Sequence, residues 1–187
     1  MAEIIMFVHD GFEEVEALTT VDVLRRAGVK VVICSMTGSM VLKGSHGIKV
    51  LADADHDDLG SPAEICGRFD GMVLPGGLPN AFTLRDDERI IRLVGLFDSE
   101  EKIVAAICAA PCVLERAGIL EGRKCTSYPD SISSQNKTYV EDSVVTDGNI
   151  ITSRGVGTAL DFALEIVSKL CGEEKAKNVA AQILHAK

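Results

Sequence analysis

Apolar residues along the chain follow two alternating patterns. Short continuous apolar runs predict buried strands, and apolar residues repeated every three or four positions predict helices. The predicted strands are Ile4–Val8, Lys30–Cys34, Gly71–Leu74 and Lys102–Ile107. The predicted helices are Glu13–Ala27, Asp86–Phe97, Ala109–Ala117, Gly157–Cys171 and Glu173–His185. Glycines follow the first and third of these helices and are typical of helix ends.

Two pairs of short apolar segments predict hairpins. One pair is Val41–Leu42 with Ile48–Leu51, and the other is Val144–Thr146 with Ile150–Thr152 around an Asp-Gly turn. The alternation of the remaining strands and helices predicts a mostly parallel sheet with helices on both faces. Ligands of such sheets bind beyond the carboxyl ends of the strands. The polar segment Ser127–Lys137 is predicted to be a loop.

Composition and charge narrow the class of protein. The 187 residues are predicted to form one domain, residues 1–187. The formal net charge is −9, which disfavours nucleic-acid binding because that role normally needs a basic face. No apolar run approaches the ~20 residues that span a bilayer. The segment Met1–Asp10 lacks the basic start and cleavage site of a signal peptide, so we expect a cytoplasmic protein.

Cysteine and histidine spacing indicates no metal site. There is no Cys-x-x-Cys pair, and the four histidines are scattered. A chain of this length does not need disulfides, so most of its six cysteines are interpreted as small buried apolar residues. We therefore expect no metal, and the question is whether one cysteine is reactive.

Cys108 is the candidate nucleophile. The predicted strand Lys102–Ile107 runs directly into it, and a predicted helix begins at Ala109, so the chain turns from strand to helix at this cysteine. That is the geometry of a nucleophile elbow, and the small residues Ala106 and Ala110 suit such a crowded turn. A helix N-terminus lowers a thiol pKa, which predicts a reactive thiolate. The alternative is a buried core cysteine.

Cys112 lies one helical turn after Cys108. It is interpreted as a core residue, with a resolving thiol as the alternative.

Acidic residues crowd the first turn of the first predicted helix. Glu13 and Glu14 are interpreted as charges that favour a helix N-terminus. Glu16 lies at the boundary of the apolar face, and burial there would raise its pKa and keep it protonated. A protonated carboxyl donates a hydrogen bond to a thiolate, whereas an ionised one repels it.

The run Leu74-Pro-Gly-Gly77 ends a predicted strand. Adjacent glycines let the backbone approach a ligand closely and present its N–H groups. We predict that the N–H groups of Gly77 and Ala109 form an oxyanion hole, with a plain tight turn as the alternative.

At these residues the sequence resembles the ThiJ/PfpI superfamily, and within it the parkinsonism-associated deglycase (DJ-one) branch and its bacterial relatives. The resemblance covers nearly the whole chain. It depends on Gly11-Phe-Glu-Glu-Val-Glu16, Val21-Asp-Val-Leu-Arg-Arg-Ala-Gly28, Val73-Leu-Pro-Gly-Gly77, Ala105-Ala-Ile-Cys-Ala-Ala-Pro111 and Thr152-Ser-Arg-Gly155 with Gly157-Thr158.

The resemblance implies a flavodoxin-like three-layer α/β sandwich and a homodimer. It implies a reactive Cys108, a protonated Glu16 beside it, and an oxyanion pocket formed by Gly76, Gly77 and Ala109. Relatives carry an arginine at the dimer interface that approaches the partner's site, and Arg26 matches it.

The sequence departs from the family pattern at two positions. Tyr128 stands where many members have a histidine near the cysteine. A phenol is a poor base at neutral pH, which disfavours a peptidase of the PfpI type. His46 stands where close relatives often have an arginine, and it either replaces that contact or faces solvent in the predicted hairpin.

Two functions follow from the resemblance. The first is a glyoxalase or deglycase without a cofactor, in which the Cys108 thiolate attacks reactive dicarbonyls or their adducts and Glu16 shuttles protons. The second is an oxidative-stress sensor or redox chaperone that uses oxidation of Cys108 to a sulfinate. A purely structural Cys108 is the remaining alternative.

Overall fold

A computed structural model describes residues 1–133 and 138–185. Seven strands form one sheet in the order β5-β2-β1-β6-β7-β9-β8. Their bounds are β1 Glu3–Val8, β2 Lys30–Ser35, β5 Ala54–Asp55, β6 Gly71–Leu74, β7 Ile103–Ile107, β8 Val144–Asp147 and β9 Ile150–Ser153. All neighbours are parallel except β8 and β9, which pair antiparallel at one edge. The mostly parallel sheet is therefore confirmed.

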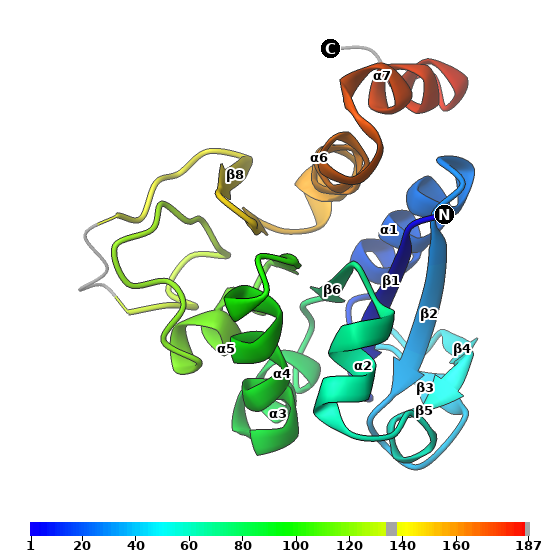
Figure 1. Ribbon diagram of the computed structural model, residues 1–187, viewed down its shortest axis with the longest axis vertical. Helices are drawn as coiled ribbons and strands as arrows, with labels where there is room; N and C mark the ends of the chain where they lie inside the picture. The colour runs from blue at the N-terminus through cyan, green and yellow to red at the C-terminus, as the bar shows by residue number, and fades with distance from the viewer. Residues whose placement is uncertain (134–137, 186–187) are drawn as a thin grey trace.

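Helices cover both faces of this sheet (Figure 1). On one face lie α1 Glu14–Arg26, α6 Ala159–Cys171 and α7 Glu173–Gln182. On the other lie α2 Pro62–Arg68, α3 Asn80–Asp86, α4 Glu88–Ser99 and α5 Pro111–Arg116. Two short 3-10 helices lie at His56–Asp58 and Val156–Thr158. The three-layer sandwich with a separate hairpin, β3 Val41–Lys43 and β4 Lys49–Leu51, is as predicted.

The apolar runs of the central strands explain the two cores. Ile4, Met6 and Val8 of β1 point into the core under α1 and α6, and Ile5 and Phe7 point into the core under the opposite helices. Successive side chains of a strand alternate between the faces of a sheet. A strand covered on both sides must therefore be apolar along its covered length, as β1 is from Ile4 to Val8.

Several boundaries differ from the sequence prediction. The strand β5 and the helices α2 and α3 were not predicted, because elements of two to seven residues carry too little periodicity. The helix predicted from Asp86 starts at Glu88, since Asp87 caps it through the N–H of Arg89. The helix predicted to reach His185 ends at Gln182. The described part of the loop predicted at 127–137 has no helix or strand, and 134–137 lie outside the described residues.

The strand order defines a switch point at the centre of the sheet. From β1 the chain proceeds first outward to β2 and later to β6 on the other side, so the order reverses at β1. Such a switch point leaves an opening beyond the carboxyl ends of the strands. Among the described residues, no helix combines the length and apolar character needed to span a bilayer.

Candidate active site

Three strand ends bring the predicted site residues together. Strands β1, β6 and β7 are neighbours, and Leu74 of β6 is in register with Ala106 of β7. Glu16 lies in the first turn of the helix after β1, Gly76 follows β6, and Cys108 follows β7. All three therefore meet at the switch point of the sheet, although they are far apart in the sequence.

Cys108 has the strained backbone of a nucleophile elbow. Its φ is +64°, a region that costs a residue with a side chain roughly 1–2 kcal/mol. Two hydrogen bonds hold it there: its N–H donates to the Ser153 carbonyl at 2.9 Å, and its carbonyl accepts the N–H of Tyr128 at 2.7 Å. The side chain is half-buried, and the N–H groups of Gly77 and Ala109 reach its sulfur.

Gly76 is needed because no side chain fits there. A Cβ on Gly76 would stand 2.6 Å from the Cβ of Cys108 and 2.7 Å from Oε2 of Glu16, closer than real contacts allow. The Gly76 N–H donates to that Oε2 at 2.9 Å. Its donor is therefore already used, which corrects the prediction that Gly76 contributes to an oxyanion pocket; Gly77 and Ala109 supply the N–H groups directed at Cys108.

Glu16 is fully buried, and its two oxygens differ. Oε2 accepts from Gly76, whereas buried Oε1 has no partner of good hydrogen-bond geometry among the described residues. Oε1 and the Cys108 sulfur both lie 3.8 Å from the position of a Cβ built on Gly155, so both face the same small space. Burial raises the pKa of Glu16 to about 7, against the Gly76 and Cys108 hydrogen bonds that lower it.

The thiol does not have the low pKa expected from its place before a helix. Burial, the charge of Glu16 and the hydrogen bond to Glu16 raise the pKa of Cys108 to about 12, and the N–H groups of Ala109 and Gly77 offset only part of this. The helix start therefore does not by itself give a low thiol pKa, because the value of about 12 applies while Glu16 is ionised. The helix α5 begins at Pro111 and has six residues, so its dipole is too short to outweigh burial.

Glu16 and Cys108 ionise as a pair. Two of the causes that raise the thiol pKa exist only while Glu16 is a carboxylate. When Glu16 holds the proton both disappear, and its O–H donates to the sulfur instead. Between pKa values of about 7 and about 12 the pair keeps one proton, and a thiolate forms when that proton lies on Glu16.

Tyr128 and Gly155 lie at the open side of the site. The Tyr128 side chain is 56% exposed, and its Cδ2 lies 3.8 Å from the position of a Cβ on Gly155. The side chain thus stands beside the space shared by Glu16 and Cys108. In the sequence Gly155 is only the last residue of the family motif Thr152-Ser-Arg-Gly155, and nothing in the local pattern predicts that it lies beside Glu16 and Cys108.

His46 is both exposed and paired. Its Nδ1 lies 2.9 Å from Oε2 of Glu14, and its backbone N–H donates to Oε1 of Glu14. Burial alone would raise the pKa of Glu14, but hydrogen bonds from His46 and from the N–H of Ile48 lower it to about 2. Glu14 is thus a buried ion-pair partner and not a simple helix-terminal charge. Glu13, Glu14 and His46 place potential metal ligands within 4.8 Å of one another, and this ion pair already explains the cluster.

Two other candidates lie outside the Glu16–Cys108 contact. Arg26 is on the exposed side of α1 and donates to Asp22 at 2.6 Å. Cys112 is buried in α5 with its sulfur 3.9 Å from the Ala81 carbonyl, and burial raises its pKa to about 11. The core interpretation of Cys112 therefore fits better than a resolving thiol.

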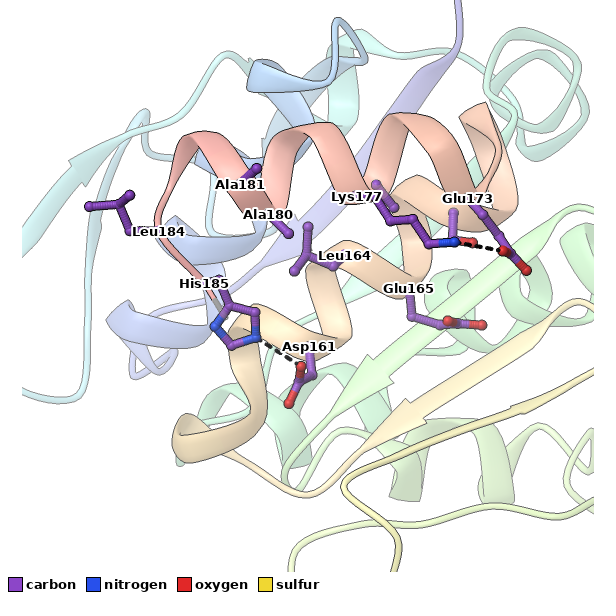
Figure 2. Close-up of a pocket in the computed structure, with 11 residues that line it drawn as sticks. Asp161, Leu164, Glu165, Glu173, Lys177, Ala180, Ala181, Leu184 and His185 are labelled. Atoms are coloured by element: carbon purple, nitrogen blue, oxygen red, sulfur yellow. Dashed lines mark hydrogen bonds and ion pairs between the residues drawn. The ribbon is translucent and has the colours of Figure 1, made fainter. Parts of the chain in front are cut away.

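A separate groove of about 800 Å³ runs between α6 and α7 (Figure 2). Asp161 pairs with His185 across it, and Glu173 pairs with Lys177. Glu165 accepts a hydrogen bond from the Thr146 hydroxyl. The acidic residues that line the groove thus have partners within the protein. The groove lacks the convergent reactive groups found at the strand ends.

A cysteine on a strand-to-helix turn, facing a buried carboxyl across a glycine pair, defines a class of α/β proteins with a nucleophile elbow. The sequence profile of the DJ-1/PfpI family matches residues 2–169, and the chain belongs to this family. It is 40% identical to protein dj-1beta of Drosophila melanogaster, over 97% of this chain and 96% of that protein.

Two further similarities extend this result. The chain is 32% identical to the glutathione-independent glyoxalase DJR-1.2 of Caenorhabditis elegans, over 98% of this chain and 96% of that protein. The structure of oxidized DJ-1 from Toxoplasma gondii has a TM-score of 0.90 and 32% identity, with both chains fully covered. The expected family and flavodoxin-like fold are therefore confirmed.

The pair interpretation predicts the pH profile of Cys108 alkylation. In the wild type the rate should rise with a midpoint near pH 7, where the pair loses its first proton. Glu16→Gln keeps a neutral hydrogen-bond donor beside the sulfur, so its midpoint should stay within about one pH unit of the wild type. Peptide mass analysis after iodoacetamide treatment measures both. A Glu16→Gln midpoint above about pH 9 would place the wild-type proton on sulfur and contradict the interpretation.

The close approach at Gly76 predicts the effect of an added methyl group. Gly76→Ala should separate Glu16 from Cys108, lower stability by about 1–3 kcal/mol and change the alkylation profile. Gly95→Ala is the matched control, because a Cβ on that α4 glycine meets no atom within 4 Å. This variant should gain about 0.5–1 kcal/mol of stability. Thermal unfolding and alkylation measure both effects. Wild-type behaviour of Gly76→Ala in both assays would show that the site tolerates the side chain.

Proposed function

We propose that the protein is a cysteine-dependent glyoxalase that needs no cofactor and acts on small 2-oxoaldehydes or on their adducts with thiols and amines. The observation that carries the proposal is the contact between a half-buried elbow cysteine and a buried carboxyl whose pKa burial raises to about 7. A group with that pKa accepts and donates protons near neutral pH. The name of the glyoxalase relative supports the same reaction class.

The first step is addition of the Cys108 sulfur to the aldehyde carbon. An S–C bond forms while the carbonyl electron pair moves to oxygen. The N–H groups of Gly77 and Ala109, which interact with the sulfur, are the donors that would stabilise the charge on that oxygen. Glu16 gives its proton to the oxygen, which completes a hemithioacetal and leaves Glu16 ionised.

The second step is proton transfer between the two carbons. Ionised Glu16 removes the hydrogen of the former aldehyde carbon while the ketone oxygen takes the negative charge, and the hydroxyl proton of the hemithioacetal moves to that oxygen. Glu16 then returns its proton to the neighbouring carbon, and a carbonyl forms again at the carbon bonded to sulfur. The product is a thioester, in which the former aldehyde carbon is oxidised and the former ketone carbon is reduced. Water then hydrolyses the thioester to a 2-hydroxy acid and restores the thiol.

Glu16 must perform these transfers without a histidine. Tyr128 stands at the position of the family histidine and is largely exposed, and phenols in general are poor bases at neutral pH. The single carboxyl serves in turn as acid and as base, and we expect slow turnover for that reason. Oε1, which faces the same space as the Cys108 sulfur, is the oxygen available for the transfers.

Formation of lactate from methylglyoxal tests this proposal. The wild type should produce lactate without added glutathione or metal, and Cys108→Ser should lose at least about 100-fold in kcat because no thioester can form. Cys171→Ser is the matched control, since Cys171 is exposed and outside the site. Absence of lactate with the wild-type protein, its Cys108 shown by mass to be intact, would rule the glyoxalase out.

A second candidate function is oxidation sensing at Cys108. The N–H groups around the sulfur and the adjacent Glu16 would also stabilise a sulfinate, which accepts hydrogen bonds from both. The Toxoplasma gondii relative was solved as an oxidized protein, which supports oxidation chemistry in the family. Because both functions use the same sulfur, oxidation would abolish the glyoxalase activity, and a redox chaperone role would depend on the oxidised form.

Mild peroxide treatment tests the second candidate. Cys108 should gain two oxygens before the other five cysteines do, since the thiolate is the form that peroxide attacks. Exposed Cys171 provides an internal comparison within the same sample, and burial raises the pKa of Cys34 to about 12. Peptide mass analysis over time gives the order. Earlier oxidation of Cys171 would exclude Cys108 as a selective sensor.

A homodimer is part of the proposal. Val15, Leu18 and Leu160 are large apolar residues left 37–48% exposed on α1 and α6. Leu18, Leu160 and Arg26 line one hollow there, and exposed apolar patches of this kind support association of copies. A location in the cytoplasm also stays a prediction.

A further inference from the structure

Asn80 is a buried side chain that the mechanism does not use. It is the first residue of α3 and has no exposed surface. Its Nδ2 donates to the carbonyls of Pro75 at 2.8 Å and Gly76 at 3.0 Å, and its Oδ1 accepts the backbone N–H of His9 at 2.7 Å. Two acceptors on one side and a donor on the other also fix which end of the amide is nitrogen.

The two carbonyls that accept hydrogen bonds from Asn80 belong to the two peptide groups whose N–H groups point toward Glu16 and Cys108. In a trans peptide the C=O of one residue and the N–H of the next point in opposite directions. The carbonyl of Pro75 therefore faces Asn80 while the N–H of Gly76 faces Glu16. The carbonyl of Gly76 faces Asn80 while the N–H of Gly77 faces the Cys108 sulfur.

We propose that Asn80 is the positioning residue of the active site: its one amide group holds both peptide planes, and thereby aims one N–H at Glu16 and the next at Cys108. Asn80 acts through the backbone of Gly76 and Gly77, so it is not a catalytic residue. This inference deepens the proposed function and rests on it in part, because the same N–H of Gly77 stabilises the thiolate and the oxyanion.

The glycine pair creates the need for such a clamp. Gly77 has a φ of +87°, and the absence of Cβ atoms at two successive residues makes rotation of the peptide between them easy. A rotated peptide would point a carbonyl oxygen at the sulfur and repel a thiolate. The Gly76 carbonyl accepts from both Asn80 and the N–H of Glu13, so both its lone pairs are engaged.

The clamp also joins the site to the central strand. His9 directly follows β1, and its N–H is the donor to Asn80. The amide group thus links the end of β1 to the turn after β6. Helix α1, which carries Glu16, begins shortly after this end of β1. Glu16 and the N–H that holds it are therefore fixed to the same frame.

Asn80→Ala and the matched variant Asn149→Ala test the inference. Asn149 also makes two Nδ2 hydrogen bonds, to Asp98 and to the Lys102 carbonyl, but at the opposite end of β7. Asn80→Ala should slow iodoacetamide alkylation of Cys108 about tenfold at neutral pH and raise its apparent pKa, because one N–H donor to the thiolate is lost. Asn149→Ala should leave both unchanged. If lactate is formed, kcat should fall about tenfold for Asn80→Ala with KM within about twofold.

Asn80→Ser covers the case in which the alanine variant does not fold. Its hydroxyl has one donor hydrogen in place of two, so its alkylation rate should lie between those of the wild type and Asn80→Ala. Equal alkylation profiles for the folded Asn80 variant and for Asn149→Ala would overturn the inference. A wild type that forms no lactate would instead defeat the glyoxalase proposal, and the alkylation comparison would still decide the role of Asn80.

Discussion

Glu16 and Cys108 are two acids confined to one poorly solvated space. Burial opposes ionisation of each, and a charge on either one opposes ionisation of the other. The pair therefore retains a proton over a wide range of pH, and the position of that proton decides whether the sulfur is a nucleophile. The surrounding fold has to bring the two groups into contact and supply donors for the resulting charge.

The sheet satisfies both requirements through neighbouring strand ends. Parallel strands β1, β6 and β7 all finish at one edge, so the residues after them converge without a long loop. The turn after β6 has to pass between the carboxyl and the thiol, which is why it contains glycine at 76. Its flexibility is then restricted from behind by Asn80. Reactivity thus depends on the residues in contact at the site, Glu16 and Cys108, and also on Asn80, which supports them through the backbone.

The sequence predicted the features of this site that depend on residues close together in the chain. The run from Lys102 through Cys108 to Pro111 shows a strand, a sharp turn and a helix start within ten residues. The glycine pair Gly76-Gly77 likewise indicates the turn in which it lies. The direction of the Glu16 shift was also predicted, because the helix pattern placed that residue against the core. Long apolar strands were found for the same reason: a doubly covered strand is apolar throughout.

Contacts between distant segments could not be predicted in the same way. Asn80 follows Pro79 in a stretch without a motif, and its importance comes from backbone groups at residues 9, 75 and 76. Glu14 was interpreted as a simple helix-terminal charge because its partner His46 comes from the hairpin. The opposing effects on the thiol pKa could not be read locally either, since the local pattern shows a helix start but neither the burial nor the nearby carboxyl.

The location of the shared proton is the central claim, and infrared spectroscopy of the Glu16 carboxyl tests it most directly. At about pH 8, above the point where the pair has lost one proton, the account predicts a protonated carboxyl band that is present in the wild type and absent in Glu16→Gln. In Cys108→Ser at the same pH the band should vanish, because a hydroxyl cannot give up its proton to the carboxyl. A wild-type spectrum that shows only ionised carboxylate would place the proton on sulfur and contradict the account.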